Sequence, residues 1–256
     1  MTVELAPATD RRTIGTEVLL VLGVSLGQSA LYALVALIAR LTAERPLSEQ
    51  TATLNASLSA RPWLDLTYQL LNVLFALVPV LLAVHLLNRE RGDARGALGL
   101  DLKRPGRDLA WGALLAAAIG LPGLGLFWVA AQLGVNASLV PAALPKIWWA
   151  VPVLILAAVQ NAVLEEVVVV GYLLTRLRDL GWRVGAAVAA SAVLRGGYHL
   201  YQGLGAFVGN AVMGVILALF FLRTRRVLPL VVAHTLLDVV AFVGYAVLPR
   251  SWFSWL

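Results

Sequence analysis

The sequence predicts an all-α polytopic membrane helix bundle of about seven transmembrane helices, with a cytoplasmic N-terminus. Hydrophobic residues make up 60% of the 256 residues and charged residues 13%, whereas soluble domains have about 45 to 50% and about 25%. Seven apolar segments approach or exceed the length of about 20 residues that a spanning helix requires. The basic residues gather in alternate loops, as the positive-inside rule describes.

The predicted spans differ in the ionisable groups that they contain. The first three have no Asp, Glu, Lys or Arg, and the sixth is also uncharged. The fourth contains Glu165 and Glu166, the fifth contains Arg195, and the seventh contains Asp238. In chain order the seven segments are 18–39, 66–87, 109–133, 147–175, 184–201, 204–222 and 227–248.

The loops set the predicted orientation. With a cytoplasmic N-terminus, 14 of the 20 Lys and Arg residues fall in cytoplasmic segments and five in external ones. This bias accounts for the net charge of +6 without nucleic acid, so we expect the lipid bilayer as a partner. We expect a multi-pass protein of the cytoplasmic membrane of a bacterial cell. The cytoplasmic basic residues are Arg11, Arg12, Arg89, Arg91, Arg95, Lys103, Arg104, Arg107, Arg176, Arg178, Arg183, Arg223, Arg225 and Arg226.

Composition divides the chain into two regions. Residues 1–146 form an N-terminal transmembrane region with the first three spans and a basic cytoplasmic linker at 89–108. Residues 147–256 carry the last four spans and every intramembrane ionisable group except His85. We therefore expect any catalytic core in the second region.

Glu165 and Glu166 oppose membrane insertion more than the other residues of the predicted spans do. Each acidic side chain at a helix centre opposes insertion by roughly 2.5 to 3.5 kcal/mol. Glu165 lies eleven residues from Arg176, which is about 16 Å along a helix, so its side chain does not reach the interface. This depth indicates a functional cavity. Because adjacent helical residues point about 100° apart, we expect the two carboxylates to serve different centres.

Two histidines complete the inventory. His234 and Asp238 are four residues apart on one helical face, and His199 on span five is predicted to lie somewhat farther out in the membrane. The absence of Cys excludes thiolate catalysis and Cys-ligated metals. The set suits a carboxylate general base with imidazoles stabilising an oxyanion. It equally suits a Zn²⁺ ion, for which the candidate ligands are Glu165, His199, His234 and Asp238.

These residues resemble the motifs of the CPBP family of intramembrane proteases, which includes the CAAX prenyl endopeptidases and Abi-type proteins. Glu165 and Glu166, followed by Gly-Tyr-Leu and basic residues, are similar to the first motif, EExxxR. His199 occupies the place of the second motif's histidine. His234 and Asp238 match the third motif, HxxxN or HxxxD.

The resemblance covers about residues 147–248 and departs from the family pattern at two positions. Val170 stands where the first motif has Arg, and Arg195 stands four residues before His199, where the family has an aromatic residue. Since a buried unpaired Arg and a buried unpaired Glu are each costly, we expect Arg195 to reach across and pair with Glu166. The rival interpretation is an inactive family member.

The resemblance implies an intramembrane endopeptidase, of the glutamate or the metalloprotease type, that hydrolyses peptide bonds of membrane-associated substrates. Glu165 would activate water or bind the metal with His199 as its partner, and His234 and Asp238 would contact the oxyanion or the metal. A proton-coupled transporter and an inactive membrane partner are the alternatives, since both would keep ionisable groups at mid-depth. The catalytic candidates are Glu165, Glu166, His199, His234 and Asp238, with Arg195 in a supporting role.

Overall fold

The protein is an all-α polytopic membrane bundle. The computed structural model describes residues 10–249, which are mostly helical. The elements are α1 (Arg11–Gly23), α2 (Leu26–Leu41), η1 (Leu47–Glu49), β1 (Thr51–Ala56), α3 (Pro62–Ala76), α4 (Val78–Arg91), α5 (Ala94–Leu98), α6 (Pro105–Gln132), β2 (Ser138–Ala143), α7 (Ala150–Glu165), η2 (Glu166–Tyr172), α8 (Leu173–Asp179), α9 (Val184–Gly197), η3 (Leu200–Gln202), α10 (Leu204–Thr224) and α11 (Leu228–Val247).

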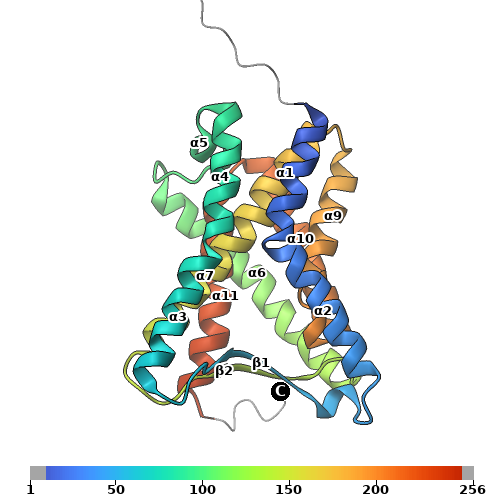
Figure 1. The fold of residues 1–256 in the computed structure, drawn as a ribbon, viewed down its shortest axis with the longest axis vertical. Coiled ribbons are helices and arrows are strands. Elements are labelled where there is room, and N and C mark those ends of the chain that lie inside the picture. Colours follow the sequence, from blue (N-terminus) through green and yellow to red (C-terminus); the bar gives the residue numbers. More distant parts are fainter. Residues whose placement is uncertain (1–9, 250–256) are drawn as a thin grey trace, which may run out of the picture.

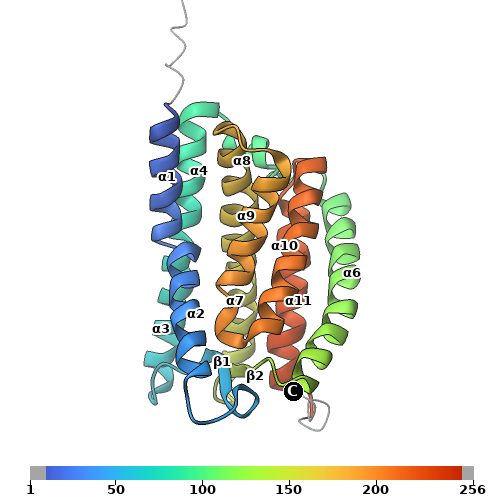
Figure 2. The same ribbon diagram turned by 90° about the vertical axis from the view of Figure 1, so that its right-hand side faces the viewer.

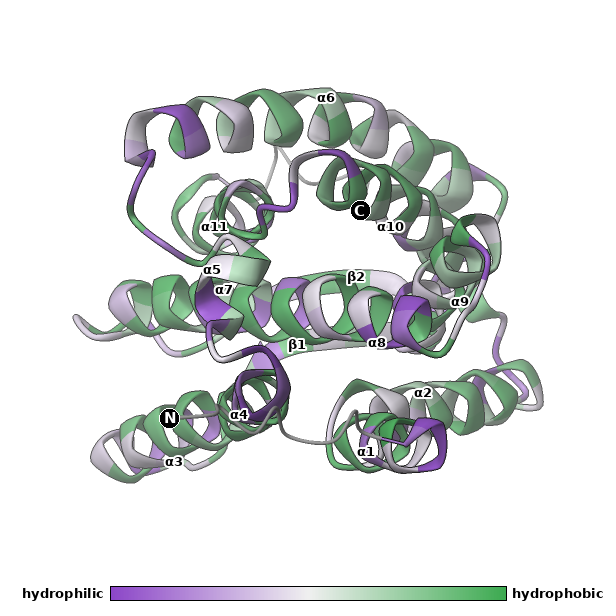
Figure 3. Ribbon diagram, turned by 90° about the horizontal axis from the view of Figure 1, so that it is seen from above, coloured by the Kyte–Doolittle hydropathy of each residue, from purple (hydrophilic) through white to green (hydrophobic). Residues whose placement is uncertain are grey.

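The long helices run along one axis of the molecule (Figures 1 and 2). Seen along that axis, α7 and α8 lie between α10 and α11 on one side and α1 to α4 on the other (Figure 3). In the most apolar 18-residue stretch of the continuous helical segment Ala150–Asp179, 56% of the residues are buried, against 11 to 28% in the other four long apolar helices. The segment that carries Glu165 and Glu166 is therefore the centre of the bundle.

All seven predicted spans are helical, but they are not equally long. Five helical segments among the described residues are long and apolar enough to cross a membrane, and the pair α1 and α2, bent by 53°, makes a sixth. The predicted fifth span is wrong in length, because α9 has only 14 residues, or about 21 Å. The chain leaves the α-helix after Gly197, so residues 198–201 do not extend it.

The ends of the bundle differ in charge. The loops from α4 to α5, from α8 to α9 and from α10 to α11 lie at the end where α1 begins (Figures 1 and 2). Arg183, Arg225 and Arg226 lie in these loops, and Arg91 and Arg178 lie on the helices beside them. The alternation of loops on which the orientation depends is thus present in the fold, and the orientation itself stays a prediction.

A two-stranded sheet closes the opposite end. β1 and β2 are parallel, with Thr51 opposite Ser138 and Ala56 opposite Ala143. The sheet continues toward the site, because Ala137 N donates to the carbonyl of Gln202 at 2.9 Å. The sequence did not predict this sheet, since parallel pairing of distant segments leaves little local signal.

The largest core cluster surrounds η2. Val168 and Val170 of η2 pack in it with Val21 of α1, Val80 of α4 and Leu217 of α10. The seven residues of η2 form a π-helix, a rare geometry that often occurs at functional sites. The first and second regions of the chain therefore share one core around the segment that follows Glu165.

Candidate active site

The two acidic residues sit where α7 changes into η2. Glu165 is the last residue of α7 and Glu166 is the first of η2. Glu165 is 8% exposed and Glu166 is fully buried. The π-helix is held from outside by Ser191, whose Oγ donates to the carbonyl of Val169 at 2.8 Å. The site is thus built at a change of helical geometry within the core.

Arg195 of α9 compensates the charge of both carboxylates. Its guanidinium is fully buried and forms an ion pair with Oε1 of Glu166. Nη1 of Arg195 lies 3.4 Å from Oε2 of Glu165. The predicted pairing of Arg195 with Glu166 is confirmed, and Val170, where the family motif has Arg, is buried in the apolar core.

His234 of α11 faces the same carboxylates with its two ring nitrogens. Nδ1 lies 2.8 Å from Oε1 of Glu166, which indicates an Nδ1–H group that donates to the carboxylate. Nε2 lies 4.0 Å from Oε2 of Glu165 and 3.7 Å from Oδ1 of Asp238. These distances exceed a hydrogen bond, so Nε2 is directed into the site without being bonded to either carboxylate.

The expectation that the two carboxylates serve different centres is wrong. Ligand atoms of Glu165, Glu166 and His234 all lie within 4.8 Å of one another. Two features overcome the 100° offset between adjacent residues. The wider turn of the π-helix begins at Glu166, and the guanidinium of Arg195 and the imidazole of His234 each have two nitrogens that reach both carboxylates.

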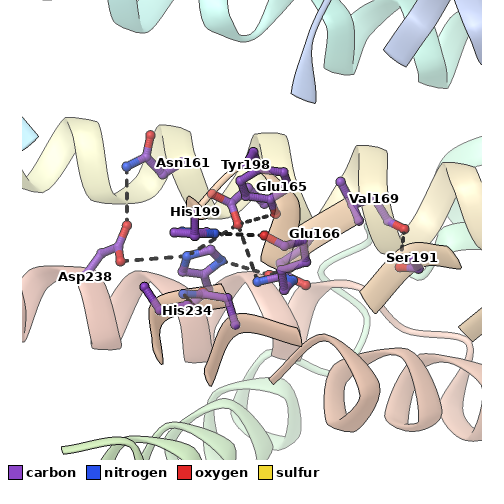
Figure 4. Close-up of polar contacts among 12 residues, drawn as sticks. Asn161, Glu165, Glu166, Val169, Ser191, Tyr198, His199, His234 and Asp238 are labelled. Atoms are coloured by element: carbon purple, nitrogen blue, oxygen red, sulfur yellow. Dashed lines mark hydrogen bonds and ion pairs between the residues drawn. The ribbon is translucent and has the colours of Figure 1, made fainter. Parts of the chain in front are cut away.

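His199 lies beside this group, although its position in the sequence indicated a shallower depth. The helix α9 ends at Gly197, and Tyr198 and His199 follow it before η3. In Figure 4 the rings of His199 and His234 lie beside the carboxyl group of Glu165. Nδ1 of His199 is 2.9 Å from the carbonyl of Arg195. Because a carbonyl only accepts, Nδ1 carries the proton and Nε2 is left for another partner.

Asp238 lies one helical turn beyond His234 and completes the set. Its side chain is 19% exposed, and Nδ2 of Asn161 donates to its Oδ2 at 3.4 Å. All of the side chains singled out from the sequence thus lie on α7, η2, α9 and α11 or, for His199, just after α9.

Two polar neighbours were missed by the sequence analysis. The hydroxyl of Tyr198 donates to Oε2 of Glu165 at 2.7 Å, and Asn161 contacts Asp238. Asn161 is four residues before Glu165 and on the same helical face, a spacing that could have drawn attention to it. Tyr198 adjoins His199 in the sequence, but nothing in the pattern indicated that it faces a carboxylate.

The metal-ligand group differs from the set that the sequence suggested. Among the described residues it consists of Glu165, Glu166 and His234, and it includes neither His199 nor Asp238. Three ligands of these types match the number that protein zinc sites with an open position use. A guanidinium that contacts both carboxylates opposes a dication at the same place, because the charges repel.

One comparison with known proteins found a match in the second region of the chain. Residues 147–240 match a family model described as type II CAAX prenyl endopeptidase Rce1-like. This part of the chain is therefore similar to the CAAX prenyl endopeptidases. No curated protein and no solved structure matches the chain. The matched residues include every acidic and histidine side chain of the site, and they begin three residues before α7.

Proposed function

We propose that the chain is an intramembrane endopeptidase that hydrolyses peptide bonds of membrane-associated substrates. The observation that carries the proposal is the position of Glu165 between two histidines in the interior of a membrane bundle. The match of residues 147–240 to a family of endopeptidases supports it. Buried carboxylates and imidazoles together supply the groups that peptide hydrolysis requires.

In the proposed reaction Glu165 is the general base and His199 is its partner. Glu165 takes a proton from a water molecule as the water oxygen attacks the carbonyl carbon of the substrate. Nε2 of His199 is available to hold that water, because Nδ1 is bonded to the carbonyl of Arg195. The C–N bond then breaks and the proton passes from Glu165 to the leaving amine.

His234 and Asp238 are proposed to stabilise the oxyanion. Nε2 of His234 makes no direct hydrogen bond to Glu165 or Asp238. With the ring protonated at both nitrogens, Nδ1–H stays bonded to Glu166 and Nε2–H can donate to the developing charge on the substrate oxygen. Asp238 would have to be protonated to donate. The Nδ1 contact to Glu166 at 2.8 Å fixes the ring orientation.

We propose the metal-free form of this reaction, because Arg195 already compensates the two carboxylates. In the alternative form Glu165, Glu166 and His234 would hold Zn²⁺, which would polarise the substrate carbonyl and activate water. The two forms differ in their response to chelators. Peptide cleavage by the purified protein should persist after 1,10-phenanthroline treatment, with less than one zinc per ten chains by elemental analysis. Loss of cleavage that Zn²⁺ restores would establish the metal form.

The test of the proposed function compares the N-termini that proteolysis creates in the membrane proteins of host cells. Cells carry the wild type, Glu165→Gln, or the matched control Glu44→Gln, at equal expression. Glu44 is exposed and lies outside the site, so the control makes the same chemical change elsewhere. Termini that appear with the wild type and with Glu44→Gln but not with Glu165→Gln support proteolysis and name its substrates.

The opposite result would favour a different class of function. If a folded and inserted protein produces no terminus that depends on Glu165, a proton-coupled transporter or an inactive family member explains the buried groups better. We further propose the cytoplasmic membrane of a bacterium as the location. Residues 1–146 would then form the surrounding transmembrane region, and residues 147–256 the catalytic core.

A further inference from the structure

The hydroxyl of Tyr198 is aimed at the proposed general base. Tyr198 follows directly after α9 and is 6% exposed. Its hydroxyl donates to Oε2 of Glu165 at 2.7 Å, the normal length for an O–H donor and a carboxylate. Among the described residues this is the one hydrogen bond to the carboxyl group of Glu165.

The groups around Glu165 converge on the same oxygen. Nη1 of Arg195 is 3.4 Å and Nε2 of His234 is 4.0 Å from Oε2. No described residue donates to Oε1. The carboxyl group is therefore anchored through Oε2, and Oε1 is the oxygen left to take a proton from water.

The ring of Tyr198 also contacts the partner of the base. The ring centroids of Tyr198 and His199 are 4.8 Å apart at an interplanar angle of 42°. Nδ1 of His199 is held by the carbonyl of Arg195 at the same end of α9. Tyr198 thus contacts both Glu165 and His199, although the sequence pattern gave it no role.

We propose that Tyr198 is a positioning residue of the hydrolytic site. Its hydroxyl fixes Oε2 of Glu165 so that Oε1 faces the reacting water, and its ring sets the orientation of His199. A neutral phenol suits this task, because Tyr198 keeps its own proton while Oε1 of Glu165 gains and loses one. The inference rests on the proposed endopeptidase function.

The experiment uses the full-length protein in lipid vesicles and a synthetic peptide that spans one Glu165-dependent cleavage site. Tyr198→Phe removes the hydroxyl and keeps the ring. Tyr201→Phe is the matched control, because it removes a hydroxyl that bonds to Gln202 and lies outside the proposed machinery. We expect kcat of Tyr198→Phe to fall about 10- to 100-fold, with KM changed less than about twofold. Tyr201→Phe should keep kcat within about twofold.

A series of fluorinated tyrosines at position 198 separates positioning from a merely structural role. Fluorination makes the hydroxyl a stronger donor while the ring size barely changes. We expect kcat to change steadily along the series at constant melting temperature. A melting temperature that falls while kcat per folded molecule stays constant would assign Tyr198 a structural role and overturn the proposal.

The outcomes distinguish this inference from the proposed function. If Glu165→Gln abolishes cleavage and Tyr198→Phe retains full kcat, the positioning role is wrong and the endopeptidase function stands. If neither the wild type nor Glu165→Gln cleaves the peptide, the function fails and the positioning role fails with it. Loss of kcat in Tyr198→Phe alone, with Tyr201→Phe unaffected, supports both.

Discussion

The guanidinium of Arg195 on α9 forms an ion pair with the carboxylate of Glu166 on η2, and both side chains are fully buried. The family motif that the chain resembles has its arginine four residues after Glu166, where this chain has Val170. In this chain the guanidinium and the carboxylate come from two different helices. Each carboxylate contacts a cation that the sequence alone places 29 or 30 residues away.

Arg195→Phe should destabilise the protein by about 3 to 5 kcal/mol, because it leaves buried carboxylates without their cation. The double variant Val170→Arg with Arg195→Phe should recover part of that loss and retain more activity, since an arginine at 170 would be four residues from Glu166 on one helix. Unfolding in mixed micelles and cleavage assays measure the two effects. A double variant no better than Arg195→Phe would refute the exchange of the two positions.

Arg176 should be a second centre of stability, at the end of the bundle with the basic loops. Its side chain is fully buried, and Nη2 lies 3.0 Å from Oε2 of Glu17 on α1. Nη1 forms an ion pair with Glu90 of α4, and the guanidinium lies over the ring of Tyr172, 5.7 Å from its centroid. These contacts join the first region of the chain to the second.

Arg176→Met should therefore lower the free energy of unfolding by about 3 to 5 kcal/mol. Arg176→Lys should also destabilise, because an ammonium group does not reproduce the planar fork that faces two carboxylates. Arg178→Met is the control, since Arg178 is exposed and donates to a backbone carbonyl. Equal stability of Arg176→Met and Arg178→Met would show that the buried network does not hold the two regions together.

Gly112 marks a close approach between α6 and α11. A Cβ atom at Gly112 would lie 2.4 Å from Cγ1 of Val232 and 3.0 Å from the carbonyl oxygen of Pro229. Gly112→Ala should destabilise the bundle by about 1 to 3 kcal/mol, the usual cost of overpacking. Gly123→Ala in the same helix meets nothing within 4 Å and should leave the melting temperature equal or slightly higher. A neutral Gly112→Ala would contradict the packing of α6 against α11.

Asp101 gives the linker between α5 and α6 a pH dependence. The backbone N–H of Lys103 and then the guanidinium of Arg226 hold the pKa of the Asp101 carboxyl below its ordinary value of 3.8. A lowered folded-state pKa contributes stability that is present above pH 3.8 and is lost as the pH falls through the folded value. Asp101→Asn should therefore lower the melting temperature at pH 7 and flatten the dependence of the melting temperature on pH below 3.8.

The spans could be predicted from the sequence because the bilayer imposes a length and a composition on each one. The predicted fifth span is the exception. The apolar pattern of residues 184–201 continues beyond Gly197, whereas the helix α9 ends there, and composition does not report where a buried helix stops. The parallel pair β1 and β2 was missed for a similar reason, since its pairing joins segments far apart in the chain.

The chemistry of the site was visible in the residue types, and its geometry was not. The free-energy cost of burying charge drew attention to Glu165 and Glu166. The pair between Arg195 and Glu166 was predicted from that cost together with the two departures from the family motif. The convergence of both carboxylates on His234 did not follow, because it depends on the π-helix at Glu166. Tyr198 escaped notice because a tyrosine in an apolar segment carries no cost that demands a partner.

The most direct test of the account uses purified protein in vesicles with a synthetic peptide from a Glu165-dependent cleavage site, in water enriched in ¹⁸O. The account predicts that the wild type and Glu44→Gln release a product with one ¹⁸O atom in its new C-terminal carboxyl group. Glu165→Gln should release none above background. Cleavage by Glu165→Gln at the wild-type rate would contradict the central claim that Glu165 activates the attacking water.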